Sequence, residues 1–342
     1  MIRADVHRHL DLGPVRLPNP VLLAPMAGIT DAPFRRMAAR FGAGLVVSEM
    51  VAGDALLRGH AETVVRAEGA GLDVHAIQLA GNEPVAMAEA ARLVEAAGAG
   101  LIDINMGCPA KRVTTGLAGS ALLRDLDLAT RIIAAVVGAV SVPVTLKTRL
   151  GWDDGALVAP ELARRAQDLG VRMVTIHGRT RCQFYTGRAD WAAIRAVREA
   201  VTIPVIANGD LVRTEDAPAM LAASGADGVM IGRGAQGRPW FPGQVAARLA
   251  RGTAPADPDL ATQRDVLLEL YDGWLAHYGR ELGVRTARKH IGWTLEAAAL
   301  SAGRPAEDGR RWRARLLVLD DPTAVKAGIR DAFDDLSWRY AA

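Results

Sequence analysis

The sequence predicts an α/β fold, namely a (β/α)8 TIM barrel followed by a small C-terminal domain made only of helices. Three observations support this prediction. Apolar, β-branched runs alternate eight times with Ala/Leu/Arg stretches of helical spacing. Polar residues gather at the C-terminal end of each run, where barrel enzymes carry their chemistry. Beyond about Gly243 the alternation stops, and only helical patterns follow.

The composition is that of a compact globular protein. Of the 342 residues, 50% are hydrophobic and 23% are charged, which excludes disordered and fibrous classes. The formal charge is 41 Lys+Arg minus 38 Asp+Glu, or +3, which is too small to establish a nucleic-acid partner. Two cysteines, Cys108 and Cys182, do not make a disulfide framework, so we expect a reducing, cytoplasmic location.

Neither secretion nor a membrane span is expected. Residues Met1–Leu12 lack the apolar core of a secretory signal. The most apolar stretch, Ile132–Leu146, is bounded by Arg131 and Lys147 and broken by Pro143. It falls short of the roughly 20 residues that a spanning helix needs.

The eight apolar runs are predicted to be the barrel strands. In order they are Val21–Gly28, Leu45–Met50, Val74–Gly81, Leu101–Cys108, Pro143–Gly151, Met173–Thr180, Pro204–Asp210 and Gly228–Arg233. Segments between them, such as Glu83–Ala97 and Pro160–Leu169, have apolar residues three and four apart. They should form amphipathic helices over a sheet that is buried on both faces. Eight such units fit a closed barrel, for which about 250 residues is typical.

An open, doubly wound sheet is the alternative fold. Its dinucleotide-binding form carries a G-x-G-x-x-G turn after the first strand. Here that turn contains Pro25, Met26 and Ala27 before Gly28, and it lacks the glycines that cradle a pyrophosphate. The closed barrel is therefore favoured.

The tail is predicted to be a separate helical domain after a linker at Gly252–Pro258. We divide the chain into a barrel domain at residues 1–250 and a helical domain at residues 256–342. The predicted helices are Val266–Leu275, Val284–Ala298, Glu307–Leu319 and Ala324–Leu336. Four of the seven tryptophans lie in the tail and can build its core: Trp274, Trp293, Trp312 and Trp338.

Cys108 is the candidate reactive group after the fourth strand, in a segment that begins with Asp103 and Asn105. The neighbouring cations Lys111 and Arg112 would lower a thiol pKa, and a protonated thiol can serve as a general acid toward a substrate carbon. The alternative is that Cys108 is a small buried hydrophobic residue, the common fate of a free cysteine.

Glycines after the last two strands predict a phosphate site. The backbone amides near Gly209 and Gly232 can form the phosphate cup of this fold, and Arg233 adds a forked donor. The alternative is that these glycines only permit tight turns. Two further residues have structural alternatives: Lys147 could pair with Asp103 or Glu49, and His177 could be a packed histidine instead of one wall of a substrate pocket.

This phosphate cup, together with a central Lys147, Gln78 and Asn105, predicts flavin mononucleotide (FMN) as the cofactor. Lys147 would lie near the N1/O2 edge of the ring, where it would stabilise an anionic reduced flavin. Carboxylates and histidines are not spaced as metal ligands, so no metal site is expected.

With these residues in view, the sequence resembles the tRNA-dihydrouridine synthases, and among bacterial branches the DusB type. The two most specific matches are the Asn-Met-Gly-Cys-Pro segment at 105–109 and the His-Gly-Arg-Thr segment at 177–180. Other matches span nearly the whole chain in family order: 24–31, 34–35, 48–50, 78–79, 146–149, 208–210, 232–233, 288–290 and 292–293.

The resemblance implies an enzyme that takes hydride from NADPH (or NADH) and reduces the C5–C6 bond of a uridine in the tRNA D-loop. The DusB-like features imply position 17. Hydride would pass from reduced FMN to C6, and Cys108 would protonate C5, while Asn105 would orient the uracil. The residues that the resemblance assigns to FMN are Pro25, Met26, Ala27, Gln78, Lys147, His177, Asn208, Gly209, Asp210, Gly232 and Arg233.

The resemblance also implies that tRNA is the partner, with no membrane and no obligate protein partner. A base must leave its stack to enter a barrel, so an additional RNA-gripping element is expected. The candidates for RNA contact are Lys111 in the barrel and Arg285, Arg288, Lys289 and His290 in the tail. The alternative is that these tail residues form an ordinary solvated helix face.

Two other functions are compatible with parts of the pattern. A flavoenzyme acting on free pyrimidines would share the barrel and the chemistry, but it would not require the helical tail. A noncatalytic RNA-binding barrel would leave the combination of Cys108, Lys147 and His177 unexplained.

Overall fold

The computed structural model describes residues 9–338, which divide into two compact units. The first unit runs up to Gly234 and includes Pro242–Ala254, and the second comprises Ala235–Phe241 and the residues from Pro255 onward. Residues 235–241, assigned to the barrel domain from the sequence, thus group with the helical unit. The reason is packing: Trp240 Nε1 donates to Asp257 Oδ1 at 2.9 Å, within the second unit.

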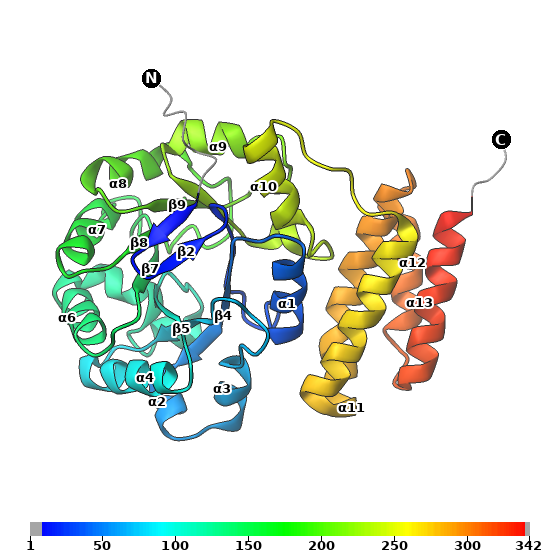
Figure 1. Cartoon of the computed structure of the whole chain (residues 1–342), viewed down its shortest axis with the longest axis horizontal. Helices are drawn as coiled ribbons and strands as arrows, with labels where there is room; N and C mark the ends of the chain where they lie inside the picture. The colour runs from blue at the N-terminus through cyan, green and yellow to red at the C-terminus, as the bar shows by residue number, and fades with distance from the viewer. Residues whose placement is uncertain (1–8, 339–342) are drawn as a thin grey trace. The chain divides into compact units, whose positions relative to one another are not determined.

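Eight parallel strands close into a barrel in the first unit (Figure 1). The last strand pairs with the first, with Val229 opposite Val21, so the sheet has no free edge. The predicted closed barrel is therefore confirmed, and the open sheet is excluded. The strands are β3 (Val21–Leu23), β4 (Leu45–Ala52), β5 (Ala76–Ala80), β6 (Leu101–Met106), β7 (Val144–Arg149), β8 (Met173–His177), β9 (Val205–Asn208) and β10 (Gly228–Ile231).

The longer helices around the barrel each bury one apolar face. Helix α4 (Pro84–Ala96) starts with proline, whose missing N–H needs no partner in a first turn, and it buries Met87 and Val94. The other α-helices are α1 (Ala32–Arg40), α2 (Gly53–Leu57), α3 (Ala61–Arg66), α5 (Lys111–Thr114), α6 (Leu126–Val137), α7 (Ala159–Asp168), α8 (Arg195–Ala200), α9 (Asp216–Ser224) and α10 (Phe241–Arg251). Short 3-10 turns are η1 (Gly119–Arg124), η2 (Ala192–Ile194) and η3 (Arg233–Ala235).

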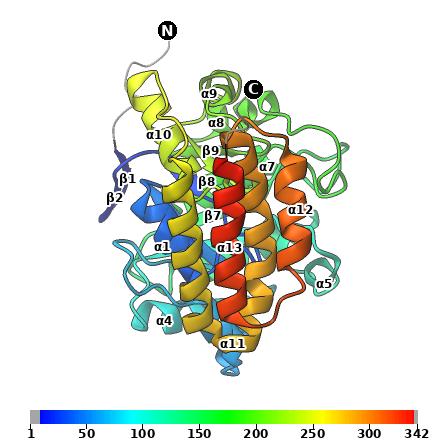
Figure 2. The ribbon, with the colours of Figure 1, turned by 90° about the vertical axis from the view of Figure 1, so that its right-hand side faces the viewer.

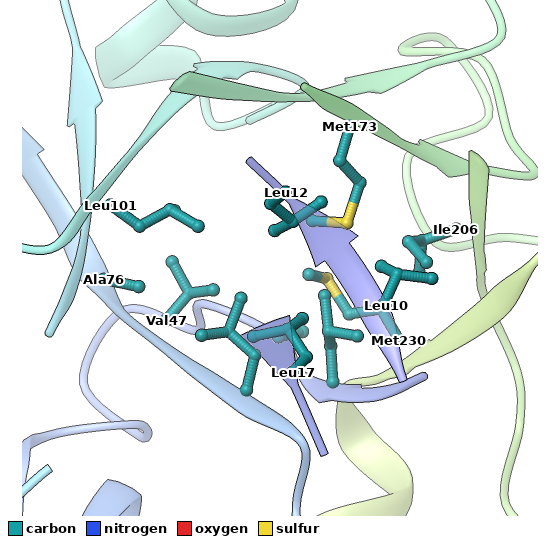
Figure 3. Close-up of a cluster of buried hydrophobic side chains, with 12 residues drawn as sticks. Leu10, Leu12, Leu17, Val47, Ala76, Leu101, Met173, Ile206 and Met230 are labelled. Carbon is teal, nitrogen blue, oxygen red and sulfur yellow. The ribbon is translucent and has the colours of Figure 1, made fainter. Parts of the chain in front are cut away.

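A short hairpin that the sequence did not indicate fills the N-terminal end of the barrel. Strands β1 (Leu10–Leu12) and β2 (Val15–Leu17) pair antiparallel. Figure 3 shows side chains of this hairpin among residues from the first positions of several barrel strands, including Leu101 and Met173. Because this end is packed with apolar side chains, polar chemistry is confined to the C-terminal ends of the strands.

The second unit is a helical bundle (Figure 2). Helix α11 (Leu260–Ser301) is broken at Gly279, whose φ of 76° and ψ of 173° are not helical, and its two halves match two of the predicted helices. The other two are α12 (Ala306–Leu316) and α13 (Pro322–Ser337). Its core includes Trp274 and Phe333. Across residues 9–338, no helix is both long and apolar enough to cross a membrane.

Candidate active site

The strand ends bring the predicted polar residues together in register. Gln78 on β5 lies opposite Asp103 on β6, and Asn105 on β6 lies opposite Lys147 on β7. His177, the last residue of β8, lies opposite Asn208 on β9. Residues far apart in the sequence therefore meet on one end of the barrel, as the closed topology requires.

Cys108 follows β6 in a loop that is held from both sides. Asn105 Oδ1 accepts hydrogen bonds from the backbone N–H groups of Gly107 at 3.2 Å and Cys108 at 2.9 Å. From the other side, Ser120 Oγ donates to the Cys108 carbonyl at 2.9 Å. The residue is partly exposed and its thiol is free, so it is not simply a buried hydrophobic residue. Lys111, at the start of α5, is exposed.

Gln78 and Asp103 are buried beneath this loop. Gln78 Nε2 donates to Asp103 Oδ2 at 2.7 Å, and Thr145 Oγ1 donates to Asp103 Oδ1 at 2.7 Å. Burial raises the pKa of Asp103, although these two hydrogen bonds oppose that effect. Both oxygens of Asp103 thus accept hydrogen bonds from residues other than Lys147, its partner in the alternative interpretation of the sequence.

Lys147 extends from β7, where its Nζ donates to Asn208 Oδ1 at 3.3 Å. Burial, and after it the positive charge of Arg149, lowers the pKa of Lys147 from 10.5 to about 8. Asn208 Nδ2 in turn donates to the Met230 carbonyl at 2.8 Å, which ties β9 to β10. The ammonium group therefore lies in a site where positive charge is in excess.

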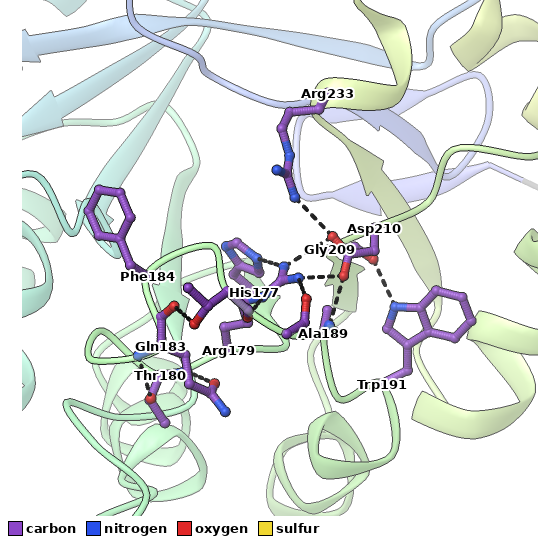
Figure 4. A network of polar contacts seen from close by, with 12 residues as sticks. His177, Arg179, Thr180, Gln183, Phe184, Ala189, Trp191, Gly209, Asp210 and Arg233 are labelled. Carbon is purple, nitrogen blue, oxygen red and sulfur yellow. Dashed lines mark hydrogen bonds and ion pairs between the residues drawn. The ribbon is translucent and has the colours of Figure 1, made fainter.

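His177 and Asp210 belong to a network centred on Arg179, which Figure 4 shows. The Arg179 guanidinium is 1% exposed, and it contacts Asp210 Oδ2 at 2.5 Å and Oδ1 at 3.1 Å. Its Nη1 also lies 3.3 Å from His177 Nε2. Burial and the surrounding cations, Lys147 first, lower the pKa of His177 far below its usual value, so the imidazole is neutral.

Both oxygens of the Asp210 carboxylate accept hydrogen bonds from the protein. Besides Arg179, the Ala189 N–H donates to Oδ2 at 2.8 Å, and Arg233 Nη2 donates to Oδ1 at 3.0 Å. Burial would raise the pKa of Asp210, but the hydrogen bonds and the two arginine charges hold it below its usual value. The structure thus places Asp210 as the counter-ion that orients Arg179 and Arg233.

The two predicted phosphate-site glycines differ in what they require. Gly209 has a φ of +127°, and a Cβ there would lie 2.6 Å from the Ala189 Cβ. Apart from its neighbours in the chain, the nearest protein atom to a Cβ on Gly232 would be Met26 Sδ, at 3.6 Å. Glycine at 209 is thus required by the turn, whereas glycine at 232 leaves room beside the end of β10.

The loop after β3 is held by side chains that accept hydrogen bonds from its backbone N–H groups. Thr30 Oγ1 accepts the Met26 N–H at 2.8 Å, and the buried Glu49 carboxylate accepts the Gly28 N–H. Glu49 is therefore engaged with this loop. The loop residues Pro25 and Met26 are partly exposed and Ala27 is exposed at the barrel end.

Arg149 and Tyr185 are site residues that the sequence-based assignment left out. The guanidinium of Arg149 is 1% exposed and donates to the carbonyls of Gly107 at 2.8 Å and Phe184 at 2.8 Å. It thereby ties the Cys108 loop to the loop after β8. The guanidinium carbons of Arg149 and Arg233 lie 5.4 and 5.3 Å from the Tyr185 ring centroid. The adjacent aromatics Phe184 and Tyr185, within a polar loop, are the sequence signal that could have pointed to this part of the site.

In the helical unit, the four predicted RNA-contact residues separate into different environments. Arg285 is exposed, Lys289 is partly exposed, and Arg288 Nη2 donates to Asp320 Oδ1 at 2.7 Å. His290 is buried, with ring centroids 4.4 Å from Trp274 and 5.4 Å from Trp293. Its inclusion in an RNA-contacting surface is wrong, because it packs in the core between two indoles.

No group of three or more His, Cys, Asp or Glu side chains within residues 9–338 has the geometry to hold a metal ion. The site is instead a set of cations and amides around one thiol.

Comparison with known proteins agrees with this arrangement. The family model described as Dihydrouridine synthase (Dus) matches residues 22–330. The chain belongs to the dihydrouridine synthase family. A relative named "Probable tRNA-dihydrouridine synthase" from Rhodobacter capsulatus is 54% identical over 329 residues, covering 95% of this chain and 98% of the relative. The "tRNA-dihydrouridine synthase B" of Xanthomonas campestris is 48% identical over 328 residues, 96% of each chain. The resemblance stated from the motifs is confirmed.

Two solved structures share the fold of this dihydrouridine synthase family member. A variant of NCR from Zymomonas mobilis has a TM-score of 0.50 and 18% identity, covering 75% of this chain and 94% of that one. The 6-hydroxypseudooxynicotine amine oxidase from Pseudomonas geniculata has a TM-score of 0.52 and 13% identity, covering 77% of this chain and 52% of that one. At these identities the likeness concerns the fold alone.

Proposed function

We propose that this dihydrouridine synthase uses FMN and NADPH to reduce the C5–C6 bond of a uridine in the tRNA D-loop, at position 17. One observation carries the proposal: a free, partly exposed thiol, Cys108, is held in a cation-rich barrel end within a chain of this family. The names of the relatives support a tRNA substrate. An enzyme that acts on tRNA is expected to work in the cytoplasm.

The charges at the barrel end suit an anionic cofactor such as FMN. Four positive charges lie close enough to lower the pKa of His177: Lys147, Arg149, Arg179 and Arg233. One carboxylate, Asp210, pairs with Arg179 and Arg233. The space beside Gly232 lets a ligand approach the backbone closely, next to the forked donor of Arg233. The residues that would hold FMN are Pro25, Met26, Ala27, Gln78, Lys147, His177, Asn208, Gly209, Gly232 and Arg233, with Asp210 orienting Arg233.

FMN held by these residues would supply the hydride that C6 of the uracil ring accepts. Lys147 favours negative charge nearby, because its ammonium group is largely retained at neutral pH with a pKa of about 8. His177 stays neutral and can donate one hydrogen bond without adding charge. The Cys108 thiol donates the proton that C5 needs, and its sulfur keeps the electron pair of the broken S–H bond.

Asn105 helps to orient the uracil by holding the loop that carries Cys108. Its Oδ1 accepts from the Cys108 N–H, and its Nδ2 donates to Gln78 Oε1 at 2.8 Å, so the side chain fixes where the thiol stands. RNA contacts come from cations that attract phosphates, namely the exposed Lys111 on the barrel and Arg285 on α11, and the partly exposed Arg288 and Lys289 on α11.

The test separates proton donation from the rest of the reaction. Cys108→Ala should bind FMN and oxidise NADPH as the wild type does, yet form little dihydrouridine in tRNA. Cys182→Ala, at the exposed cysteine, is the matched control and should retain product formation. Full product formation by Cys108→Ala would remove the thiol from the reaction, and absence of flavin from the wild type would remove FMN.

A further inference from the structure

Three buried polar side chains form one hydrogen-bonded row beneath Cys108. Asp103, Gln78 and Asn105 are 2%, 1% and 7% exposed. Gln78 Nε2 donates to Asp103 Oδ2 at 2.7 Å, and Asn105 Nδ2 donates to Gln78 Oε1 at 2.8 Å. The row ends where Asn105 Oδ1 meets the backbone of the Cys108 loop.

The groups at the two ends of this row determine which atom donates and which accepts in each of its hydrogen bonds. The backbone N–H groups of Gly107 and Cys108 can only donate, so Asn105 must turn its oxygen toward them and its NH2 toward Gln78. Gln78 must then present its oxygen to Asn105 and its NH2 to position 103. An acceptor is needed there, and an aspartate supplies one, with its second oxygen taken by Thr145.

We infer that Asp103 is a positioning residue that, through Gln78 and Asn105, sets the backbone of Cys108 and so the place of its thiol. This inference rests on the proposed role of Cys108 as proton donor. A reversed amide at 78 or 105 would set oxygen against oxygen or NH2 against N–H in a buried site, where an unmatched polar contact is expensive.

An exchange of side chains between the two ends tests this direction. In Asn105→Asp, position 105 can still accept from the Cys108 N–H, but it has no NH2 for Gln78. Gln78 must then turn, and its oxygen meets the carboxylate of Asp103. Adding Asp103→Asn supplies an NH2 to that oxygen and leaves Thr145 with an acceptor, so the double variant satisfies the row with the opposite direction.

We expect dihydrouridine formation to fall about tenfold or more in Asn105→Asp and to return to within about threefold of wild type in the double variant. Asp103→Asn alone should stay within about threefold of wild type, because its oxygen can face Gln78 while Thr145 Oγ1 rotates to accept. The thermal unfolding midpoints of the three variants should rank in the same order as their activities, because the midpoint depends on the hydrogen bonds of the row and not on catalysis.

The double variant also controls for charge. It keeps the new carboxylate beside Cys108, so a defect caused by that charge, or by loss of a direct uracil contact from Asn105, would persist. A double variant no better than Asn105→Asp in both activity and midpoint would overturn the inference. An inactive wild type would refute the proposed function. The unfolding midpoints of the variants would still show whether the hydrogen bonds of the row run in the inferred direction.

Discussion

Lys147 carries a charge that the folded barrel does not fully compensate. Burial, followed by the charge of Arg149, lowers the pKa of Lys147 from 10.5 to about 8. This difference of about 2.5 pKa units corresponds to roughly 3 kcal/mol, because one unit is worth about 1.36 kcal/mol. Lys147→Met keeps a similar side-chain length and removes the charge, so it should stabilise the flavin-free protein near neutral pH.

The pH dependence follows from a folded-state pKa that is lower than the unfolded one. Between pH values of about 8 and 10.5, the unfolded chain holds a proton that the folded chain has released, so the wild type gains stability as pH rises. Below a pH of about 8 the whole penalty is present. The advantage of Lys147→Met should therefore be largest there, up to about 3 kcal/mol, and should shrink as the pH approaches about 10.

Thermal unfolding of flavin-free wild type and variant across this pH range measures the effect. The midpoint of Lys147→Met should exceed that of wild type by up to about 6 to 10 °C near neutral pH. Lys147→Arg is the matched control, because its guanidinium stays charged throughout and should show no comparable pH-dependent gain. A Lys147→Met midpoint that is lower than wild type, or an equal difference at both ends of the range, would refute the reasoning.

Three further predictions concern other parts of the site. Arg179→Met removes a buried guanidinium from its ion pair with the partly exposed Asp210 and should lower the unfolding midpoint by about 10 °C, with the exposed Arg188→Met as control; a loss below about 3 °C would contradict the network. Gly209→Ala should lower both the midpoint and FMN affinity, because the new Cβ meets Ala189, whereas Gly187→Ala has open space and should keep FMN affinity. In salt titrations of tRNA binding, Arg285→Ala should reduce the slope by about one, and an unchanged slope would exclude a phosphate contact.

The barrel could be predicted from the sequence because its signals are local and repeated. The β-branched runs have their small or polar residues at their C-terminal ends and alternate with segments of helical spacing, so both strand order and the active end follow. The β1–β2 hairpin was not predicted, because two three-residue strands have too few positions to show alternation. Its role becomes visible only when Leu12 and Leu17 meet the barrel interior.

Contacts between residues far apart in the sequence could not be predicted for the candidate site. Arg179 stands in the His-Gly-Arg-Thr motif at 177–180, yet its partner Asp210 lies 31 residues away, so the ion pair that defines its role is a tertiary feature. Adjacency in the sequence groups His290 with Arg288 and Lys289. Helical spacing from the buried Ala287 would have placed it on the apolar face instead.

The most direct test is the dihydrouridine content of tRNA, position by position, in a strain lacking this gene and after restoring it as wild type or as Cys108→Ala. We predict loss of dihydrouridine at D-loop position 17, recovery with the wild-type gene, and no recovery with Cys108→Ala. An unchanged pattern in the deletion strain, with no second family member present, would contradict the proposed tRNA substrate and redirect the assay to free pyrimidines.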